Sequence, residues 1–128
     1  MGRNQGREEM NINELAIAIY RDALIKGWHT PKEEENQFIE MTCNNLHDEV
    51  SELHEAWRSN ELHALCDKSD KMVTAGIRPL TCLEEELADI LIRALEACAF
   101  QGVEPEDIIS RKMAYNRTRP HRHGGKKS

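Results

Sequence analysis

Apolar residues recur three and four positions apart in several stretches of the chain, a pattern typical of helices that each bury one face. The first helix is expected over about 11–26, where Gly27 supplies a stop. Another is expected over about 81–101, with Thr81 as N-cap and Glu84 completing a capping box three residues later. No stretch alternates between apolar and polar residues as a strand would. The predicted fold class is therefore all-α, a bundle of four to five helices.

The second helix carries a strong start signal, with Thr30 as N-cap and Pro31 at the first helical position. We expect this helix to run from there to about Ser59. A break at 43–45 is left open, because those residues are poor helix formers. A last helix, which opens on a proline, is expected over about 104–117.

The segment that joins the second and third helices, 60–81, is less periodic and is longer than a bundle needs. Its part over 68–79 is predicted to be a loop, and long loops in compact domains are often functional. The predicted organisation is a flexible N-terminal arm over 1–10, a helical domain over 11–117 and a basic C-terminal tail over 118–128.

Two acidic residues lie beside the apolar face of the second predicted helix. Glu49 borders that face and Glu52 lies one turn further along, so their β-carbons are roughly 5–6 Å apart. The face itself consists of Leu46, Val50, Leu53 and Trp57. Carboxylates this close repel each other, and burial raises the cost of keeping both ionised unless a cation or a proton lies between them. The pair therefore indicates a metal site.

The third predicted helix repeats this arrangement. Glu86 borders its apolar face at the same offset, and Asp89 follows three residues later. That face consists of Leu83, Leu87, Ile90, Ala94 and Cys98. If both faces enter one core, four carboxylates converge at its edge. Oxygen ligands alone suit a hard cation, Mg²⁺ or Mn²⁺, which usually takes substrate phosphates as further ligands. Neither Glu-x-x-His nor His-Glu-x-x-His occurs, which counts against a di-iron site and a zinc protease.

A basic segment near the C-terminus complements the acids. Lys112 and Asn116 share one face of the last predicted helix, and Arg119 follows where that helix ends. An ammonium, an amide and a guanidinium that face an acidic cluster filled with Mg²⁺ would hold a triphosphate from both sides. Without the acids, a solvated basic tail or a loose nucleic-acid contact would be the simpler interpretation.

Charge and cysteine content limit the class of protein. The formal net charge of -6 argues against a general nucleic-acid binder, because phosphate backbones attract basic surfaces. The 4 cysteines show no close pairing, and no apolar run near the N-terminus resembles a signal peptide or a membrane span. We therefore expect a cytoplasmic protein with no membrane contact and no stable nucleic-acid binding.

Three segments together resemble a known family, the MazG-like branch of the all-α nucleoside triphosphate pyrophosphohydrolases. The segments are DEVSEL, EEELADILIRALE and KMAYNRTRPHRHGGK, and the likeness covers roughly 12–126. The resemblance implies a helical bundle that assembles as a homodimer or as a dimer of dimers, with active sites near the subunit interface. It also implies Mg²⁺-dependent cleavage of a nucleoside triphosphate, with a deoxynucleotide favoured, at the α–β phosphoanhydride. The role implied is the removal of unwanted nucleotides.

The resemblance carries over to individual residues. It implies a metal-binding set of Glu49, Glu52, Glu86 and Asp89. Asp48 matches an additional acid that acts beside this set or orients the attacking water, so the candidate catalytic residues are Asp48, Glu49 and Glu52. The segment that matches the family's phosphate-binding residues supplies Lys112, Asn116 and Arg119.

The base pocket is the least defined part of the implied site. In the family it draws on the first helix and the start of the second, which nominates Ile19, Trp28, His29 and Phe38, each of which could equally be a core residue. The link between Glu52 and Glu86 is longer than in compact family members. Which residues of 69–78 close over the site is therefore left open.

A function of another class is also open, a non-enzymatic helical interaction module whose basic tail contacts a partner or nucleic acid. This hypothesis predicts no triphosphate turnover. It also predicts binding whose salt dependence vanishes when residues 117–128 are deleted. An assay of pyrophosphate release with Mg²⁺ separates the two functions.

Overall fold

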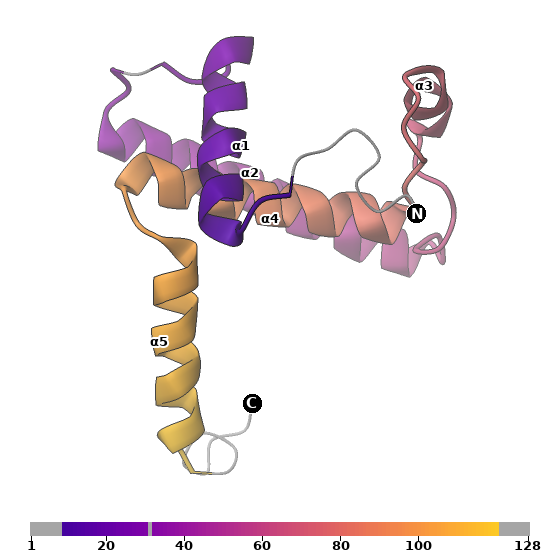
Figure 1. Ribbon diagram of the computed structural model, residues 1–128. Coiled ribbons are helices and arrows are strands. Elements are labelled where there is room, and N and C mark those ends of the chain that lie inside the picture. The colour runs from indigo at the N-terminus through magenta and orange to yellow at the C-terminus, as the bar shows by residue number, and fades with distance from the viewer. Residues whose placement is uncertain (1–8, 31, 121–128) are drawn as a thin grey trace.

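The computed structural model describes residues 9–30 and 32–120. In these ranges the chain forms α1 (Ile12–Lys26), α2 (Glu35–Arg58), α3 (Ser69–Thr74), α4 (Cys82–Gln101) and α5 (Pro105–Thr118). The long helices α2 and α4 lie side by side, α1 crosses them, and α5 leads away from the end of α4 (Figure 1). The β-structure in the described ranges is a single isolated bridge between Leu65 and Thr81. The predicted all-α fold class is confirmed.

Parts of the predicted organisation fall outside the described residues. The expected N-terminal arm, 1–10, is described only from residue 9, and the expected basic tail, 118–128, only as far as residue 120. Pro31, the predicted first residue of the second helix, also lies outside. Within the described ranges, no helix has the length and the apolar character needed to cross a membrane.

The ends of α1 and α4 form as the sequence predicts. Thr81 Oγ1 accepts a hydrogen bond from the Glu84 amide at 3.1 Å, and the Glu84 side chain accepts one from the Thr81 amide at 2.9 Å. A reciprocal cap between Asn11 and Glu14, which was not predicted, opens α1. Both helices end at a glycine in the left-handed region, where a side chain would be strained, with φ of 81° at Gly27 and 70° at Gly102. α5 also keeps to its predicted bounds within one residue.

The start predicted for the second helix is wrong, because α2 begins at Glu35 and not directly after Thr30. The cause is the burial of His29, whose side chain is 3% exposed. Its Nδ1 lies 3.0 Å from Glu33 Oε1, and its Nε2 lies 3.2 Å from Glu96 Oε1 on α4. A ring held between two carboxylates fixes the chain ahead of Glu35 in a turn, so the helix begins only after that turn.

α2 is continuous, without the break considered at 43–45, and its packed face differs from the predicted one. The buried residues of the helix are Phe38, Thr42 and Glu49. Two residues of the predicted apolar face are instead largely exposed, at 51% for Val50 and 60% for Trp57. The carboxylate of Glu49 therefore lies in the interface between α2 and α4 and not at the edge of a buried apolar stripe.

Aromatic rings form the core where α1, α2 and α4 meet. Phe38 is fully buried, and its ring stacks on that of Phe100 with the centroids 3.9 Å apart. Tyr20 meets both rings edge-on, at 6.2 Å and 6.0 Å. Pairs of this kind contribute about 0.5–1.5 kcal/mol beyond the burial of their area. Phe38, which was one candidate for a base pocket, is therefore a core residue.

The link between α2 and α4 is attached to the start of α4. The Cys66 amide donates to the Leu80 carbonyl, and the Cys82 amide donates to the Ala64 carbonyl, both at 2.8 Å. The short helix α3 lies within 68–79, where the sequence predicts a loop, so that prediction misses one helix. These contacts hold the link against the end of α4 that lies furthest from the aromatic core.

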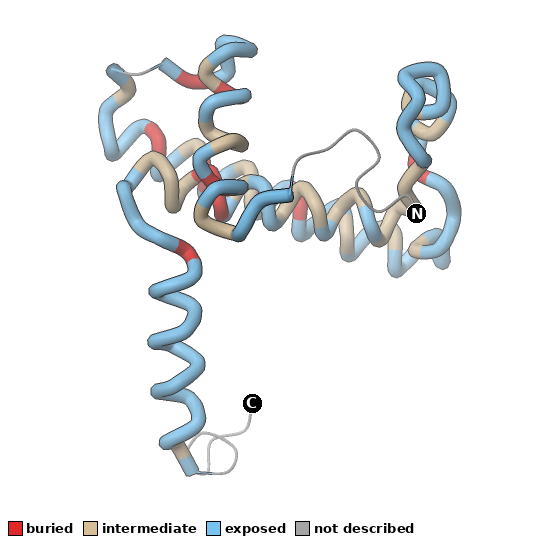
Figure 2. Tube along the Cα trace, in the orientation of Figure 1, coloured by how far each residue is buried: buried red, intermediate tan, exposed pale blue. Residues whose placement is uncertain are grey.

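α5 stands apart from the α2–α4 pair. It packs against α1, where the Glu106 amide donates to Asn13 Oδ1 at 3.0 Å. Pro105 is buried, but the remainder of the helix is exposed (Figure 2). The exposed surface includes apolar side chains, those of Ile108, Ile109, Met113 and Tyr115.

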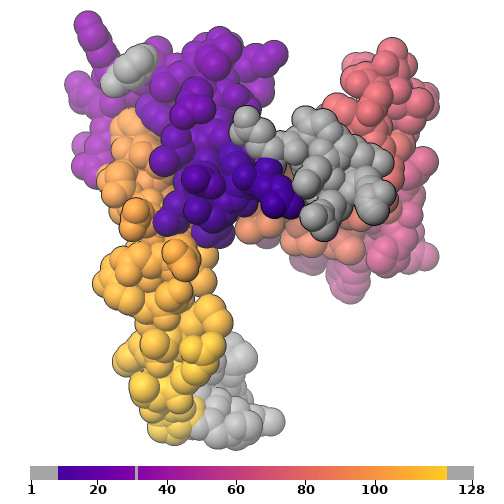
Figure 3. Space-filling view, viewed as in Figure 1, coloured from indigo at the N-terminus to yellow at the C-terminus, as the bar shows by residue number. Residues whose placement is uncertain are grey.

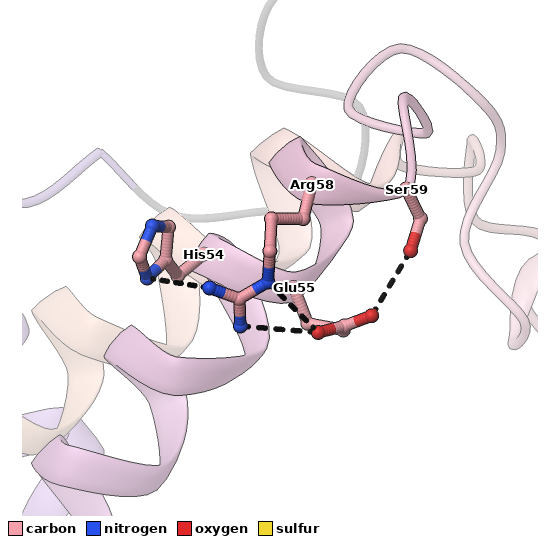
Figure 4. A network of polar contacts seen from close by, with 4 residues as sticks. All are labelled: His54, Glu55, Arg58 and Ser59. Atoms are coloured by element: carbon pink, nitrogen blue, oxygen red, sulfur yellow. Dashed lines mark hydrogen bonds and ion pairs between the residues drawn. The ribbon is translucent and has the colours of Figure 1, made fainter.

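Four polar residues at the end of α2 contact one another on the surface (Figure 4). Arg58 Nη2 donates to Glu55 Oε1 at 3.1 Å, and Ser59 Oγ donates to Glu55 Oε2 at 3.0 Å. His54 lies 3.4 Å from Arg58 and stacks on the ring of Trp57. Exposed contacts within one helix contribute only a few tenths of a kcal/mol each. These contacts therefore lie at the C-terminal end of α2, on the surface, and are not part of the α2–α4 interface.

Candidate metal centre and adjoining pocket

Carboxylates from α2 and α4 meet in the interface between the two helices. Oxygen atoms of Glu49, Glu52 and Glu86 lie within 4.8 Å of one another. Asp89 lies one turn after Glu86, and its negative charge acts on Glu49 across the interface. The structure thus brings three of the four predicted acids within 4.8 Å of one another, while Asp89 lies nearby on α4 outside that group. We call these four residues the carboxylate cluster.

Crowding and burial raise the pKa of three of these carboxyl groups. Burial, followed by the charge and the hydrogen bond of Glu52, raises the pKa of Glu86 to about 7. Burial, followed by the charges of Asp89 and Glu52, raises the pKa of Glu49. Burial and the charge of Glu85 raise the pKa of Asp89. A bound cation would favour the ionised forms of all of them.

One oxygen atom of the cluster lacks a donor. Glu86 Oε1 is buried, and no described residue donates a hydrogen bond to it. A buried polar atom left unpaired costs free energy, and a cation at this position would pair with it. A site whose protein ligands are all carboxylate oxygens suits a hard cation, so these residues fit Mg²⁺, with Mn²⁺ as a substitute.

We expect the metal-free protein to lose stability as the pH rises. Between the ordinary value of 4.5 and about 7, folded Glu86 keeps a proton that the unfolded chain has released. The folded state then binds more protons than the unfolded state, so the free energy of unfolding falls with increasing pH. Thermal unfolding in EDTA at several pH values across this window measures the slope. Glu86→Gln should flatten the slope, and a wild-type stability that rises through the window would contradict the assignment.

Two cations lie beside the carboxylate cluster, and sequence reasoning missed both. Arg93, one turn after Asp89, has its Nε 3.7 Å from Glu49 Oε2. Lys68, in the link before α3, has its Nζ 2.6 Å from Glu85 Oε2. Both positive charges act on Asp89 in the direction that lowers its pKa, against the stronger effect of burial. The cluster therefore has a positive group at each end.

An open pocket of about 280 Å³ adjoins the cluster, and its lining residues are Trp28, His29, Met41, Asn45 and Arg93. Trp28 is 66% exposed, so its indole is accessible to a ligand. Asn45 lies one turn before Glu49 on α2. Of the residues predicted to contact a base, Trp28 and His29 line the pocket. Ile19 is half-buried on α1 and is not among the described residues that line it.

The predicted phosphate-binding residues lie on α5 or at its end, outside this site. Lys112 and Arg119 each approach the ring of Tyr115, at 5.1 Å and 5.6 Å from its centroid. After the left-handed turn at Gly102, α5 packs against α1 and extends away from the α2–α4 pair (Figure 3). Within one chain, the structure therefore does not place Lys112, Asn116 and Arg119 opposite the acids, contrary to expectation.

Asp48 is exposed on α2 and lies outside the group of carboxylates within 4.8 Å, so the geometry gives it no direct metal contact.

Comparison with known proteins does not assign this chain to a family. No protein-family model, curated protein or solved structure matches this chain. The MazG-like resemblance of its motifs therefore remains a hypothesis.

Proposed function

We propose that this protein is a MazG-like nucleoside triphosphate pyrophosphohydrolase that uses Mg²⁺ to remove unwanted nucleotides in the cytoplasm. The observation that carries the proposal is the convergence of Glu49, Glu52 and Glu86 within 4.8 Å between two helices. Packing alone does not account for this arrangement, because like charges held this close together raise the free energy of the folded chain. A cluster that binds divalent cations, and through them a triphosphate, does account for it.

Hydrolysis at this site requires a group that accepts a proton and groups that hold the phosphates. Bound at the cluster, Mg²⁺ would neutralise phosphate charge and lower the pKa of a water molecule. A carboxylate of α2, Glu49 or Glu52, accepts a proton from the attacking water, whose oxygen forms a bond to the α-phosphorus. The bond from that phosphorus to the α–β bridging oxygen breaks, and pyrophosphate leaves with the electron pair. No bond to the protein forms.

The pocket beside Arg93 is the proposed place for the nucleoside. Trp28 offers an exposed aromatic face for stacking on a base, and the amide of Asn45 offers both a donor and an acceptor for a base edge. Arg93 lies between the pocket and Glu49. A nucleotide that reaches from the pocket to the cluster would bring its α-phosphate past this guanidinium. We propose a deoxynucleoside triphosphate as the substrate class.

Two features support assembly as a homodimer or as a dimer of dimers. Apolar side chains on α2 and α4 are left uncovered by the chain itself, with Val50 51%, Trp57 60% and Leu91 59% exposed. In addition, α5 carries basic residues away from the acids of its own chain. In the proposed assembly, Lys112, Asn116 and Arg119 of one chain would face the carboxylate cluster of another.

We expect the purified protein to release pyrophosphate from at least one member of a panel of ordinary and damaged nucleoside triphosphates in Mg²⁺. EDTA should stop the release, and Mn²⁺ should restore part of it. Chromatography of the nucleotide products locates the cut, because equal amounts of monophosphate and pyrophosphate place it at the α–β bond. Diphosphate with inorganic phosphate would contradict the proposal. No turnover, together with binding that requires residues 117–128, would favour the interaction module instead.

A further inference from the structure

Lys68 lies at the end of the carboxylate cluster that is opposite to the pocket. Its Nζ lies 2.6 Å from Glu85 Oε2 and 3.2 Å from Asp67 Oδ1. The Glu85 side chain is 13% exposed and that of Lys68 is 61% exposed, so the ammonium lies at the surface above a largely buried carboxylate. An ammonium has three donors, and its two partners among the described residues leave one donor for a ligand.

The backbone around Lys68 is held in place by the start of α4. The Cys66 amide donates to the Leu80 carbonyl at 2.8 Å, and the Cys66 side chain is 3% exposed. The Ser69 amide donates to the Cys66 carbonyl at 3.1 Å, which closes a turn that contains Lys68. A cation that the fold has already positioned loses less conformational entropy when it binds an anion than one on an open chain.

Charged groups follow one another along α4 in an order that matches an extended nucleotide. Arg93 stands at the pocket end, and Glu86 and Asp89 stand at the centre. Glu85, with Lys68 bound to it, stands at the far end. The helix between residues 85 and 93 spans about 12 Å at its usual rise. A nucleotide with its base in the pocket and its α-phosphate at the centre would direct its remaining phosphates towards Lys68.

We infer that Lys68 binds the β- and γ-phosphates of the substrate, and therefore the pyrophosphate product. This inference rests on the proposed function. It assigns a phosphate-binding cation within the same chain as the carboxylates, in addition to the basic residues of α5. As the bond at the α-phosphorus breaks, negative charge accumulates on the departing pyrophosphate, and an ammonium in this position stabilises that charge.

Inhibition by each of the two products tests the inference. Monophosphate formation is followed by chromatography, with either pyrophosphate or nucleoside monophosphate added as inhibitor. The proteins compared are the wild type, Lys68→Gln and the control Lys71→Gln. The control removes an exposed lysine from α3. Lys68→Gln should weaken inhibition by pyrophosphate about tenfold, the usual loss for a hydrogen bond to a charged group. Inhibition by the monophosphate, which leaves Lys68 uncontacted, should change less than about twofold. Lys71→Gln should behave as the wild type.

The outcomes separate this inference from the proposed function. A wild type that forms no monophosphate from any nucleotide overturns the proposed function and the inference with it. An active wild type with equal pyrophosphate inhibition in Lys68→Gln and Lys71→Gln overturns the inference alone, and so does an equal loss of inhibition by both products. Lys68→Arg keeps the charge and should retain most of the pyrophosphate inhibition. If it lost as much as Lys68→Gln, the role of Lys68 would be structural.

Discussion

Glu49→Gln should lower the rate of pyrophosphate release by at least about 100-fold, since even partners that only support metal ligands cost 10–100-fold when removed. The substitution changes one oxygen to an amide and leaves the volume of the side chain nearly unchanged. Because burial and like charges raise the pKa of Glu49 in spite of Arg93, neutral glutamine should make the metal-free fold at least as stable as the wild type. Steady-state kinetics and thermal unfolding in EDTA measure the two effects.

A matched control for this variant is Glu40→Gln, the same chemical change at an exposed position of α2. It should leave turnover unchanged. Mg²⁺ provides a second readout that does not depend on activity, because a cation that binds only the folded state raises the unfolding temperature. That increase should be present in the wild type and in Glu40→Gln and much smaller in Glu49→Gln. Substantial turnover in Glu49→Gln would mean that the metal site is misassigned.

Glu96→Ala should destabilise the fold by about 1–3 kcal/mol, the usual cost of leaving a buried hydrogen-bonding group without its partner. The Glu96 side chain is 4% exposed, and its Oε1 lies 3.2 Å from Nε2 of His29. Without it, a buried ring nitrogen loses its partner, and the turn that precedes α2 loses its attachment to α4. Equilibrium unfolding in urea measures the change in the free energy of unfolding.

An exposed ion pair supplies the comparison for this effect. Asp107 and Arg111 on α5 lie 2.9 Å apart, with side chains 55% and 72% exposed. Asp107→Ala should cost less than about 1 kcal/mol, because water screens such a pair. Glu96→Gln, which keeps an acceptor oxygen, should cost less than Glu96→Ala. If Glu96→Ala cost no more than Asp107→Ala, the buried contacts of His29 would not stabilise the fold as described.

Helix ends set by neighbouring residues could be predicted from the sequence. The caps of α1 and α4 depend on side chains three residues apart, and the glycines after both helices follow from backbone sterics alone. The start of α2 depends instead on the contact of His29 with Glu96 on another helix. A local signal at Thr30 cannot report that contact, which explains why the predicted start was wrong.

The residues of the candidate site could be predicted where their spacing along a helix determines which face they lie on. The repeated acid pairs share one geometry, so their convergence followed once the two helices packed together. Arg93, one turn after Asp89, and Asn45, one turn before Glu49, could have been found by the same spacing rule. Lys68 could not have been found in this way, because it reaches Glu85 on α4 only through the folded link between α2 and α4.

The hydrophobic pattern also misjudged which face of α2 is packed. A rule that looks for apolar residues ranks a glutamate as solvent-facing, yet Glu49 is buried and Val50 is half exposed. Likewise, the separation of α5 from the acids depends on how the helix packs against α1. Neither feature has a local signal in the sequence, because both depend on contacts between helices.

The antiparallel helices α2 and α4 are joined in different ways along their length. Near the aromatic core, stacked rings and the contacts of His29 hold the helices together without help from solvent. Further along, mutually repelling acids occupy the same interface. The half near the aromatic core is therefore held by contacts that need no ion. We expect the stability of the acidic half, in contrast, to change with the pH and with the divalent cations of the solution.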